Sequence, residues 1–459
     1  MNLSESFALE IVNFSDTDLT SEDRSALGHL LLDNAGVSIG GRKQPCVVAA
    51  VKWAEASSSS GSACMIGSSA RVAPDVAALV NGVAGHSNEL DDTHEPSLSH
   101  PGCIVITAAL ATATNSTTGP QFLAAVAAGY ETMARLGEAA DPPHILHKGF
   151  HPTILFGTFG AASAAAKMLG LDVHGLLTAW GHALSLTGGA MQFSNEASGT
   201  DVKRMHAGYA ARNGVMAAQF SQAGITAPLR PLDGKYGFLH LFGGNTEKKE
   251  SQLRCRSSGL LAVRETSLKP YSCCRLFHCV IDGLHVLYGA ALPQPDDTVE
   301  ISVKSSKIVA EQHMMRDPKS SMAAQYSLPY SLGATLAFGA NAYEAYEQEY
   351  LDNPRIRAWA QKVRFEVDPQ YEALYPHRFG ASVEVRMRSG EVRSTEVLDG
   401  YGSPANPMTY PLVRDKARQL IARVDEQLDF SALEDAIEGL VRGGSLIPFR
   451  RAYFSTAVG

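Results

Sequence analysis

The chain has 459 residues, of which 45% are apolar and 19% charged, an ordinary globular composition in a chain long enough for two domains. The formal net charge of −8 excludes an overall positive field for a nucleic-acid backbone. The seven cysteines argue against a disulfide framework, and the sequence shows neither a signal peptide nor an apolar run of the roughly 18 residues that span a membrane. We therefore expect a soluble cytoplasmic protein without nucleic-acid or membrane partners.

Helical patterns dominate from about residue 5 to 245. Residues 15–39 carry Ser, Thr and Asp start signals, and Thr20 to Asp23 (TSED) resembles a capping box with Asp in place of Glu. Segments rich in Ala and Gly follow at 107–113, 121–140 and 154–172. Small residues let helices approach closely, so we expect these helices to be buried on several sides.

Strand patterns begin near residue 295. Apolar and polar residues alternate, as in half-buried strands, at 299–303, 363–367, 381–387 and 392–398. RSGE, at 388–391, is a plausible hairpin turn between the last two. The segment 412–428 is helical again. These patterns predict a mainly α protein with a large all-helical domain and a smaller α+β domain near residues 270–400, and we expect the C-terminal helices to return to the first domain.

Residues 86–100, HSNELDDTHEPSLSH, concentrate titratable groups directly after an apolar stretch. If a helix that starts at Asp75 continues, its spacing places His86, Glu89 and Thr93 near one face, at i, i+3 and i+7. Asp92 could sit beside them. His100 follows through a short polar loop. The stretch could be a charged helix end, a metal site or part of a proton-transfer site. No His-x₃-His or Cys-x₂-Cys pair stands beside matching partners, which argues against the metal site.

Three later segments carry basic side chains among apolar residues. GFHPT places His151 before a proline at the start of a helix, where the positive helix end favours the neutral imidazole of a general base. KRMH places Lys203 and His206 where a loop enters another helix of small residues. LKPYSCCRLFH contributes Lys269, Tyr271, Cys273, Cys274, Arg275 and His278. The structural alternatives are a first-turn histidine, surface charge and a reduced, buried cysteine pair.

No cofactor motif accompanies these residues. GTFGAAS, at 157–163, lacks the third glycine and the preceding strand of a nucleotide loop, and we find no P-loop, nucleophile elbow or EF-hand loop. His, Lys and Arg in apolar contexts suit the binding of a small polycarboxylate and the movement of a proton on a carbon next to a carboxylate. Arg and Lys would hold the carboxylates, and His or Lys would take the proton.

At these residues the sequence resembles the MmgE/PrpD family. The matching pieces are HSNELDDTH with SHPG, GFHPT with the following GTFGAAS, KRMHAGYAARNG, and LKPYSCCRLFH with IDG, in the family's order. The resemblance implies a helical domain over 1–268 and 402–459, an α+β lid domain over 269–401, and a homodimer. Known members are 2-methylcitrate dehydratases, cis-aconitate decarboxylases and an epimerase of iminodisuccinate. All act on small polycarboxylates without a metal or an organic cofactor, so we expect neither here.

Carried over position by position, the resemblance implies an active site. The implied catalytic residues are His100, His151 and Lys203. The implied substrate-binding residues are Glu89, Asp92, Thr93, Lys269, Cys274, Arg275 and His278. Two positions depart from the decarboxylases, which have an aspartate where this chain has Glu89 and a catalytic histidine that aligns with Cys274. We expect His86 and His94 to be structural.

Our leading hypothesis is an epimerase of the iminodisuccinate type, which needs one base to remove a proton and another to return it. A dehydratase would need one base and one acid, and the same side chains could serve it. A cis-aconitate decarboxylase fits less well because of Glu89 and Cys274. A non-catalytic carboxylate-binding protein and a metalloenzyme that uses the cluster at 86–100 are the remaining alternatives.

Overall fold

The computed structural model describes residues 1–455 except 58–59, 197–198, 245–252, 254–258 and 290. The chain forms two compact units. The helical unit comprises Met1–Ala190, Val202–Thr266 and Thr409–Gly459, and the α+β unit comprises Met191–Asp201 and Ser267–Met408. The predicted fold class, a large helical part and a smaller α+β part, is confirmed. Met191–Asp201, which lies within the predicted helical domain, groups with the α+β unit.

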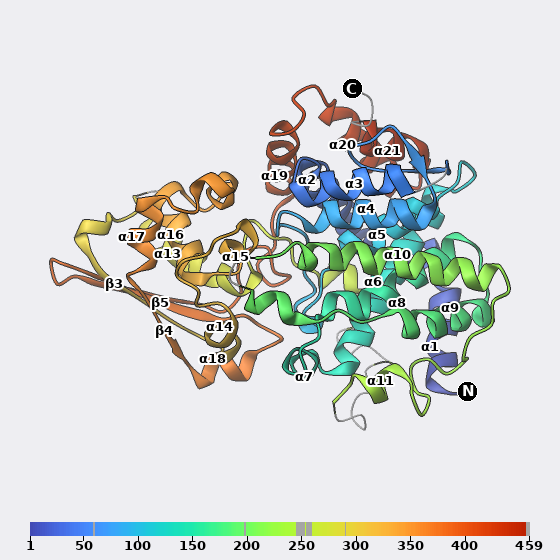
Figure 1. Ribbon diagram of the computed structural model, residues 1–459, viewed down its shortest axis with the longest axis horizontal. Helices are drawn as coiled ribbons and strands as arrows, with labels where there is room; N and C mark the ends of the chain where they lie inside the picture. Colours follow the sequence, from blue (N-terminus) through green and yellow to red (C-terminus); the bar gives the residue numbers. More distant parts are fainter. Residues whose placement is uncertain (58–59, 197–198, 245–252, 254–258, 290, 456–459) are drawn as a thin grey trace. The chain divides into compact units, whose positions relative to one another are not determined.

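The helical unit is built almost entirely of α-helices, which Figure 1 labels. They are α1 (Leu3–Asn13), α2 (Ser21–Gly41), α3 (Pro45–Ser57), α4 (Pro74–His86), α5 (Gly102–Thr112), α6 (Gly119–Ala140), α7 (Pro142–His147), α8 (Pro152–Met168), α9 (Val173–Leu186), α10 (Val202–Gln222), α11 (Phe238–Leu241), α19 (Tyr410–Ala422), α20 (Phe430–Val441) and α21 (Leu446–Tyr453). A small antiparallel pair, β1 (Ala63–Cys64) and β2 (Arg71–Val72), accompanies them. Among the described residues, no helix combines the length and hydropathy needed to cross a membrane.

Small residues let the central helices of this unit pack closely. α10 packs on α8, α4 and α9, and every residue of α5 is buried. On α10, a Cβ atom added to Gly214 would lie 2.4 Å from the Cβ of Ala161 and 2.6 Å from the backbone nitrogen of Ala162 on α8. A side chain there would push the helices apart, so the expectation of closely packed, buried helices in the Ala- and Gly-rich segments is confirmed.

Two local predictions in this unit have opposite outcomes. The capping box is confirmed, because the Asp23 N–H donates to Thr20 Oγ1 at 3.2 Å and the Thr20 N–H donates to Asp23 Oδ2 at 3.0 Å. The continuation of the helix from His86 to Thr93 does not occur. α4 ends at His86, and Glu89 adopts a left-handed φ of 54°. Helical spacing fails here because the residues after His86 bond to side chains on other helices instead of continuing the backbone ladder.

The α+β unit contains one four-stranded sheet in the order β4-β3-β5-β6, with β4 parallel to β3 and the other pairs antiparallel. Its helices and strands are α13 (His278–Tyr288), β3 (Thr298–Ser305), α14 (Lys307–Gln312), α15 (Ser321–Gln325), α16 (Leu328–Phe338), α17 (Pro354–Ala360), β4 (Val363–Val367), α18 (Pro369–Leu374), β5 (Ala381–Met387) and β6 (Val392–Val397). α13 packs on β5 and β6, and the buried Val303 of β3 faces Val383 of β5. The four predicted strands and the hairpin are confirmed.

A buried lysine ties the C-terminal helices to the N-terminal part of the helical unit. Lys416 on α19 contacts Asp33 on α2, with 2.6 Å between Nζ and Oδ1, and donates to the carbonyl of Leu90 at 2.7 Å. Figure 1 shows α19 beside α2, although their residues lie at opposite ends of the chain. The carbonyl of Leu90 belongs to the loop after α4, so this lysine also holds that loop in place.

Replacing Lys416 with methionine should therefore destabilise the protein by about 3–5 kcal/mol, because the Asp33 carboxylate would stay buried without its cation. The double variant Asp33→Asn/Lys416→Met removes both charges and should recover most of the loss. Thermal and urea unfolding of the two variants test this. An equal loss in both variants would contradict the role of the ion pair.

Candidate active site

The loop at 87–101, between α4 and α5, is rich in polar side chains and nevertheless buried. Four consecutive residues of it each contact a different helix. The contacts are Glu89 with Lys203 on α10, the Leu90 carbonyl with Lys416 on α19, Asp91 with His86 on α4, and Asp92 with Tyr130 on α6. These pairings offset the cost of placing charges in an apolar interior. They also fix the backbone that carries the predicted site residues.

Asp92 anchors the loop to α5 and α6. Its Oδ1 accepts the Gly102 N–H at 2.8 Å, and its Oδ2 accepts the Tyr130 hydroxyl at 2.6 Å. A Cβ atom on Gly102 would lie 2.8 Å from both Asp92 Oδ2 and the Tyr130 oxygen, so only glycine fits there. Burial raises the pKa of Asp92 to about 7, against the lowering effect of these hydrogen bonds. The carboxyl group of Asp92 therefore anchors the loop, whereas its backbone carbonyl accepts a hydrogen bond from His100.

His100 is held by Nδ1. That nitrogen lies 2.8 Å from the carbonyl oxygen of Asp92, 3.2 Å from Thr93 Oγ1 and 3.6 Å from Asp91 Oδ2. A carbonyl oxygen can only accept, so Nδ1 carries the proton and Nε2 of the neutral ring has the lone pair. Neutral His100 can therefore accept a proton at Nε2. Asp92 and Thr93 thus hold His100, whereas Glu89 pairs with Lys203.

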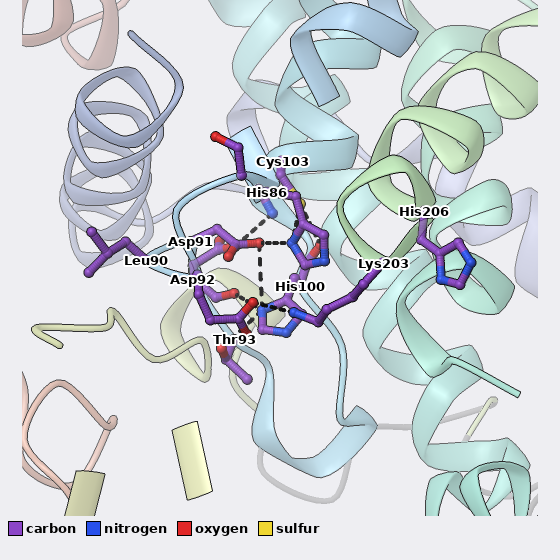
Figure 2. A network of polar contacts seen from close by, with 12 residues as sticks. His86, Leu90, Asp91, Asp92, Thr93, His100, Cys103, Lys203 and His206 are labelled. Atoms are coloured by element: carbon purple, nitrogen blue, oxygen red, sulfur yellow. Dashed lines mark hydrogen bonds and ion pairs between the residues drawn. The ribbon is translucent and has the colours of Figure 1, made fainter. Parts of the chain in front are cut away.

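Lys203 and Glu89 form a buried ion pair. Nζ of Lys203 donates to Oε2 of Glu89, although the two residues lie 114 positions apart. The left-handed backbone at Glu89, with a φ of 54°, costs on the order of 1 kcal/mol or more for a residue other than glycine. The strained residue, Glu89, is therefore the one whose carboxylate pairs with Lys203. Figure 2 shows the Lys203 side chain extending from its helix toward His100 and the loop.

His151 stands at the N-cap of α8, as predicted, and its Nδ1 lies 3.0 Å from Nδ1 of His206 on α10. Burial, assisted by His206 and Lys203, holds the pKa of His151 well below its ordinary value. Burial and the charges of His86 and Lys203 lower the pKa of His206 to about 4. Both rings are therefore neutral at pH 7, and one donates to the other. The expected neutral imidazole at His151 has burial as its first cause.

Two residues that sequence reasoning left out of the site belong to this cluster. Asp91 Oδ2 lies 2.6 Å from His86 Nδ1, and the His86 ring centroid is 5.1 Å from that of His100 and 6.2 Å from that of His151. The side chains of His86, Asp91, His100 and Lys203 converge in Figure 2. The only sequence signal for Asp91 is its position beside Asp92, and no periodicity distinguishes the two.

Two groups of side chains in the described part of the chain are close enough together to be considered as cation ligands. The first is His86, Asp91 and Cys103, and the second is His94, Glu138 and Glu265. In the first, the 2.6 Å between His86 Nδ1 and Asp91 Oδ2 is a direct hydrogen bond, because two ligands of a tetrahedral zinc ion lie roughly 3.3 Å apart. Burial raises the pKa of the Cys103 thiol well above its ordinary value, which disfavours a thiolate ligand. The first group is thus a hydrogen-bonded cluster.

Four predicted site residues belong to the α+β unit: Lys269, Cys274, Arg275 and His278. Lys269 is fully buried, and the Cys274 side chain is partly exposed. Arg275 donates to the carbonyls of Tyr401, at 2.7 Å, and Gly400, at 3.1 Å. It also donates to Nδ1 of His278 at 3.0 Å, which leaves the proton of that ring on Nε2, 3.4 Å from the Cys273 carbonyl. These contacts brace α13. Contact of the four predicted residues with substrate stays a prediction.

Comparison with known protein families assigns most of the chain to one family. The chain combines a helical unit, which holds buried imidazoles and a lysine, with an α+β unit. Two models of one protein family match these parts of the chain. MmgE/PrpD N-terminal domain matches residues 5–251, and MmgE/PrpD C-terminal domain matches residues 271–438. The chain belongs to the MmgE/PrpD family, as its motifs predict.

The chain is similar to several proteins that are named as enzymes. The chain is 27% identical to human cis-aconitate decarboxylase over 453 residues, which cover 95% of this chain and 91% of that protein. It is 25% identical to cis-aconitate decarboxylase-like protein oryM of Aspergillus oryzae, over 94% of this chain and 92% of that protein. It is also 25% identical to cis-aconitate decarboxylase of Aspergillus terreus, over 95% and 92%. The family and these relatives indicate an enzyme.

The raised pKa of Asp92 predicts a specific pH dependence of stability. With a folded-state pKa of about 7 against an ordinary 3.8, the carboxyl group stabilises the fold fully only below pH 3.8, and this contribution is lost as the pH rises through 7. Asp92→Asn does not ionise, and its amide can accept the Gly102 N–H and donate to the Tyr130 hydroxyl oxygen, so its stability relative to the wild type should rise by about 2–3 kcal/mol between pH 5 and pH 8. Urea unfolding across this range measures the difference. Asp435→Asn, on the exposed face of α20, is the matched control, and a difference as flat as the control's would contradict the prediction.

Proposed function

We propose that this protein is an enzyme that moves a proton on the carbon next to a carboxylate of a small polycarboxylate, with its own side chains as acid and base. The observation that carries the proposal is the buried cluster of neutral His151, Nδ1-protonated His100 and cationic Lys203 in one helical unit. A proton next to a carboxylate is weakly acidic, and its removal creates an enolate-like charge. The cluster supplies both a base and a cation for that charge.

Each part of the cluster suits one task. His100 can accept a proton at Nε2, because its Nδ1–H is held by the Asp92 carbonyl. His151 is neutral at physiological pH because burial lowers its pKa, so it too can act as a base. Lys203 brings a buried positive charge, which acts more strongly on a developing anion there than it would in water. The same charge would attract a carboxylate of the substrate.

Among reactions of this kind we propose an epimerase of the iminodisuccinate type. Two histidines anchored on different elements support it, because inversion at carbon needs a base on each face. His100 is fixed by the loop before α5, and His151 is fixed by the start of α8. A dehydratase would use the same residues as one base and one acid, so the products must distinguish these reactions.

Decarboxylation of cis-aconitate is the second candidate, because the named relatives are similar over more than nine-tenths of their length. Two observations argue against it. The resemblance implies that the catalytic histidine of the decarboxylases stands at the position of Cys274, and a thiol is a weaker acid than an imidazolium. His278, four residues further on, has one ring nitrogen bound by Arg275 and the other directed at the Cys273 carbonyl. It is therefore committed to the α+β unit.

Proton NMR of the purified enzyme in D₂O separates these reactions. Iminodisuccinate stereoisomers, 2-methylcitrate and cis-aconitate are incubated one at a time. Deuterium entering a C–H position with interconversion of stereoisomers is the expected result. New olefinic signals from 2-methylcitrate would establish a dehydratase, and itaconate from cis-aconitate would establish a decarboxylase. No reaction with any of them would contradict the proposed function and favour a carboxylate-binding protein.

Replacing His100 with glutamine should lower turnover of the active substrate by on the order of 10²–10⁴-fold, because the ring that accepts the proton is lost. The melting temperature should change by only a few degrees. His174→Gln, at an exposed position of α9, is the matched control and should keep wild-type turnover. Parallel losses of activity and stability in the His100 variant would assign it a structural role.

Replacing Cys274 with histidine tests the second candidate directly. If the missing imidazole is what blocks decarboxylation, Cys274→His should form itaconate from cis-aconitate at least tenfold faster than the wild type. Cys274→Ala removes the thiol without adding a donor and should show no gain. Rapid itaconate formation by the wild type itself would mean that Cys274 does not limit this reaction.

A further inference from the structure

Asp91 lies between two imidazoles in the helical unit. Its Oδ2 atom is 2.6 Å from Nδ1 of His86 and 3.6 Å from Nδ1 of His100, and all three side chains are buried. Figure 2 draws both contacts to the same carboxylate oxygen. One carboxylate therefore faces the same ring nitrogen of two histidines that come from different elements, α4 and the loop before α5.

This arrangement settles where the ring protons lie. A carboxylate accepts hydrogen bonds, so Asp91 places a proton on Nδ1 of His86, and its charge 3.6 Å from Nδ1 of His100 favours a proton there as well. Neutral His100 then offers the lone pair of Nε2, whereas the Asp91 charge can balance a second proton on Nε2 of His86. His100 has the same tautomer imposed by the Asp92 carbonyl at 2.8 Å. For His86, the Asp91 carboxylate provides the short contact, at 2.6 Å.

The second nitrogen of His86 is a buried polar atom as well. Among the described residues, His86 Nε2 is buried and has no hydrogen-bond partner. A buried polar atom without a partner costs about 1–3 kcal/mol. Its ring lies 5.1 Å from that of His100 and 6.2 Å from that of His151, the two proposed bases. Such an atom in such a place is typical of a group kept for a ligand.

We propose that Asp91 is a positioning residue for both rings, which supports His100 as the base, and that His86, protonated against the Asp91 carboxylate, donates its Nε2–H to a carboxylate oxygen of the polycarboxylate. This inference rests on the proposed function and deepens it by adding two residues to the site. Because His86 touches the substrate and Asp91 acts through the two rings, removing each should have a different kinetic effect.

The other charged and titratable groups around His100 are largely compensated, so the Asp91 carboxylate has the greatest effect on the charge of its ring. Lys203 is paired with Glu89, Asp92 has a raised pKa of about 7, and burial keeps the Cys103 thiol protonated. The groups that face His100 from its own loop and from α4, α5, α8 and α10 are Glu89, Asp91, Asp92, His86, Cys103, His151 and Lys203. Removing the charge of Asp91 should therefore make protonation of His100 less favourable.

The first experiment compares Asp91→Asn with the wild type on the substrate found by NMR. The variant should lose kcat by on the order of 10²-fold or more, because an amide can hold the His86 ring in the wrong tautomer and no longer stabilises the charge that His100 gains as the base. The acidic limb of its kcat/KM profile should move to lower pH by about one unit. Asp435→Asn should leave both unchanged. An Asp91 variant that is folded and shares the wild-type rate and pH profile would overturn the proposal.

The second experiment isolates His86 Nε2. In His86→Asn the side-chain amide can still donate to Asp91 from near the position of Nδ1, but nothing replaces Nε2. KM should rise at least tenfold while the pH profile stays in place. In His86→Gln, which has no donor near Nδ1, the pH profile should shift as well. A wild-type KM in His86→Asn would overturn the substrate contact.

A third measurement does not depend on any substrate. Side-chain ¹⁵N NMR of histidine-labelled protein reports the tautomer of each ring, with His86→Gln and His100→Gln assigning the signals. The wild type should show protonated Nδ1 in both rings, and Asp91→Asn should convert part of the His86 signal to the other tautomer. Failure of all three candidate substrates would refute the proposed function and leave this test intact. Unchanged tautomers in folded Asp91→Asn would refute the positioning role.

Discussion

Burial of ionisable groups in a helical interior is the constraint on which the rest of the site depends. Taking a carboxylate or an ammonium group out of water costs several kcal/mol, and only close partners offset it. In the helical unit, Lys203 meets Glu89 and Lys416 meets Asp33 in this way. Because each partner comes from a distant part of the chain, the pairing also determines how the helices are assembled.

The loop between α4 and α5 concentrates this effect. Glu89, Leu90, Asp91 and Asp92 contact α10, α19, α4 and α6 in turn. A loop tied at successive residues to different helices has little freedom, and the left-handed backbone at Glu89 persists because these contacts hold it. The histidine that the loop carries, His100, is then oriented by backbone and side-chain acceptors that cannot move independently. Such prior orientation is what proton transfer in a buried site requires.

Relatives that share this framework can differ in reaction through few side chains. Bases, a cation and a water-poor interior serve any step in which a proton leaves a carbon next to a carboxylate. The product formed after that step depends on which group returns a proton and to which atom. In the α+β unit, the family resemblance implies that Cys274 stands where the decarboxylases have a histidine, and the nearby His278 is bound by Arg275. Under the proposed function, single proton donors rather than the fold would separate epimerisation from dehydration.

The sequence by itself determined the family, the strands of the α+β unit, the capping box at Thr20 and the N-cap position of His151, because each depends on residues close together in the chain. Only the tertiary structure decided that α4 ends at His86, that Asp92 turns its carboxyl group to Tyr130, and that Asp91 stands between two imidazoles. Periodicity reports which face of an element is buried, but it carries no information about which polar group lies opposite. In this protein such partners can lie far apart in the sequence, as Glu89 and Lys203 do. The pairing of these charges forms a buried loop where the sequence suggested a helix end.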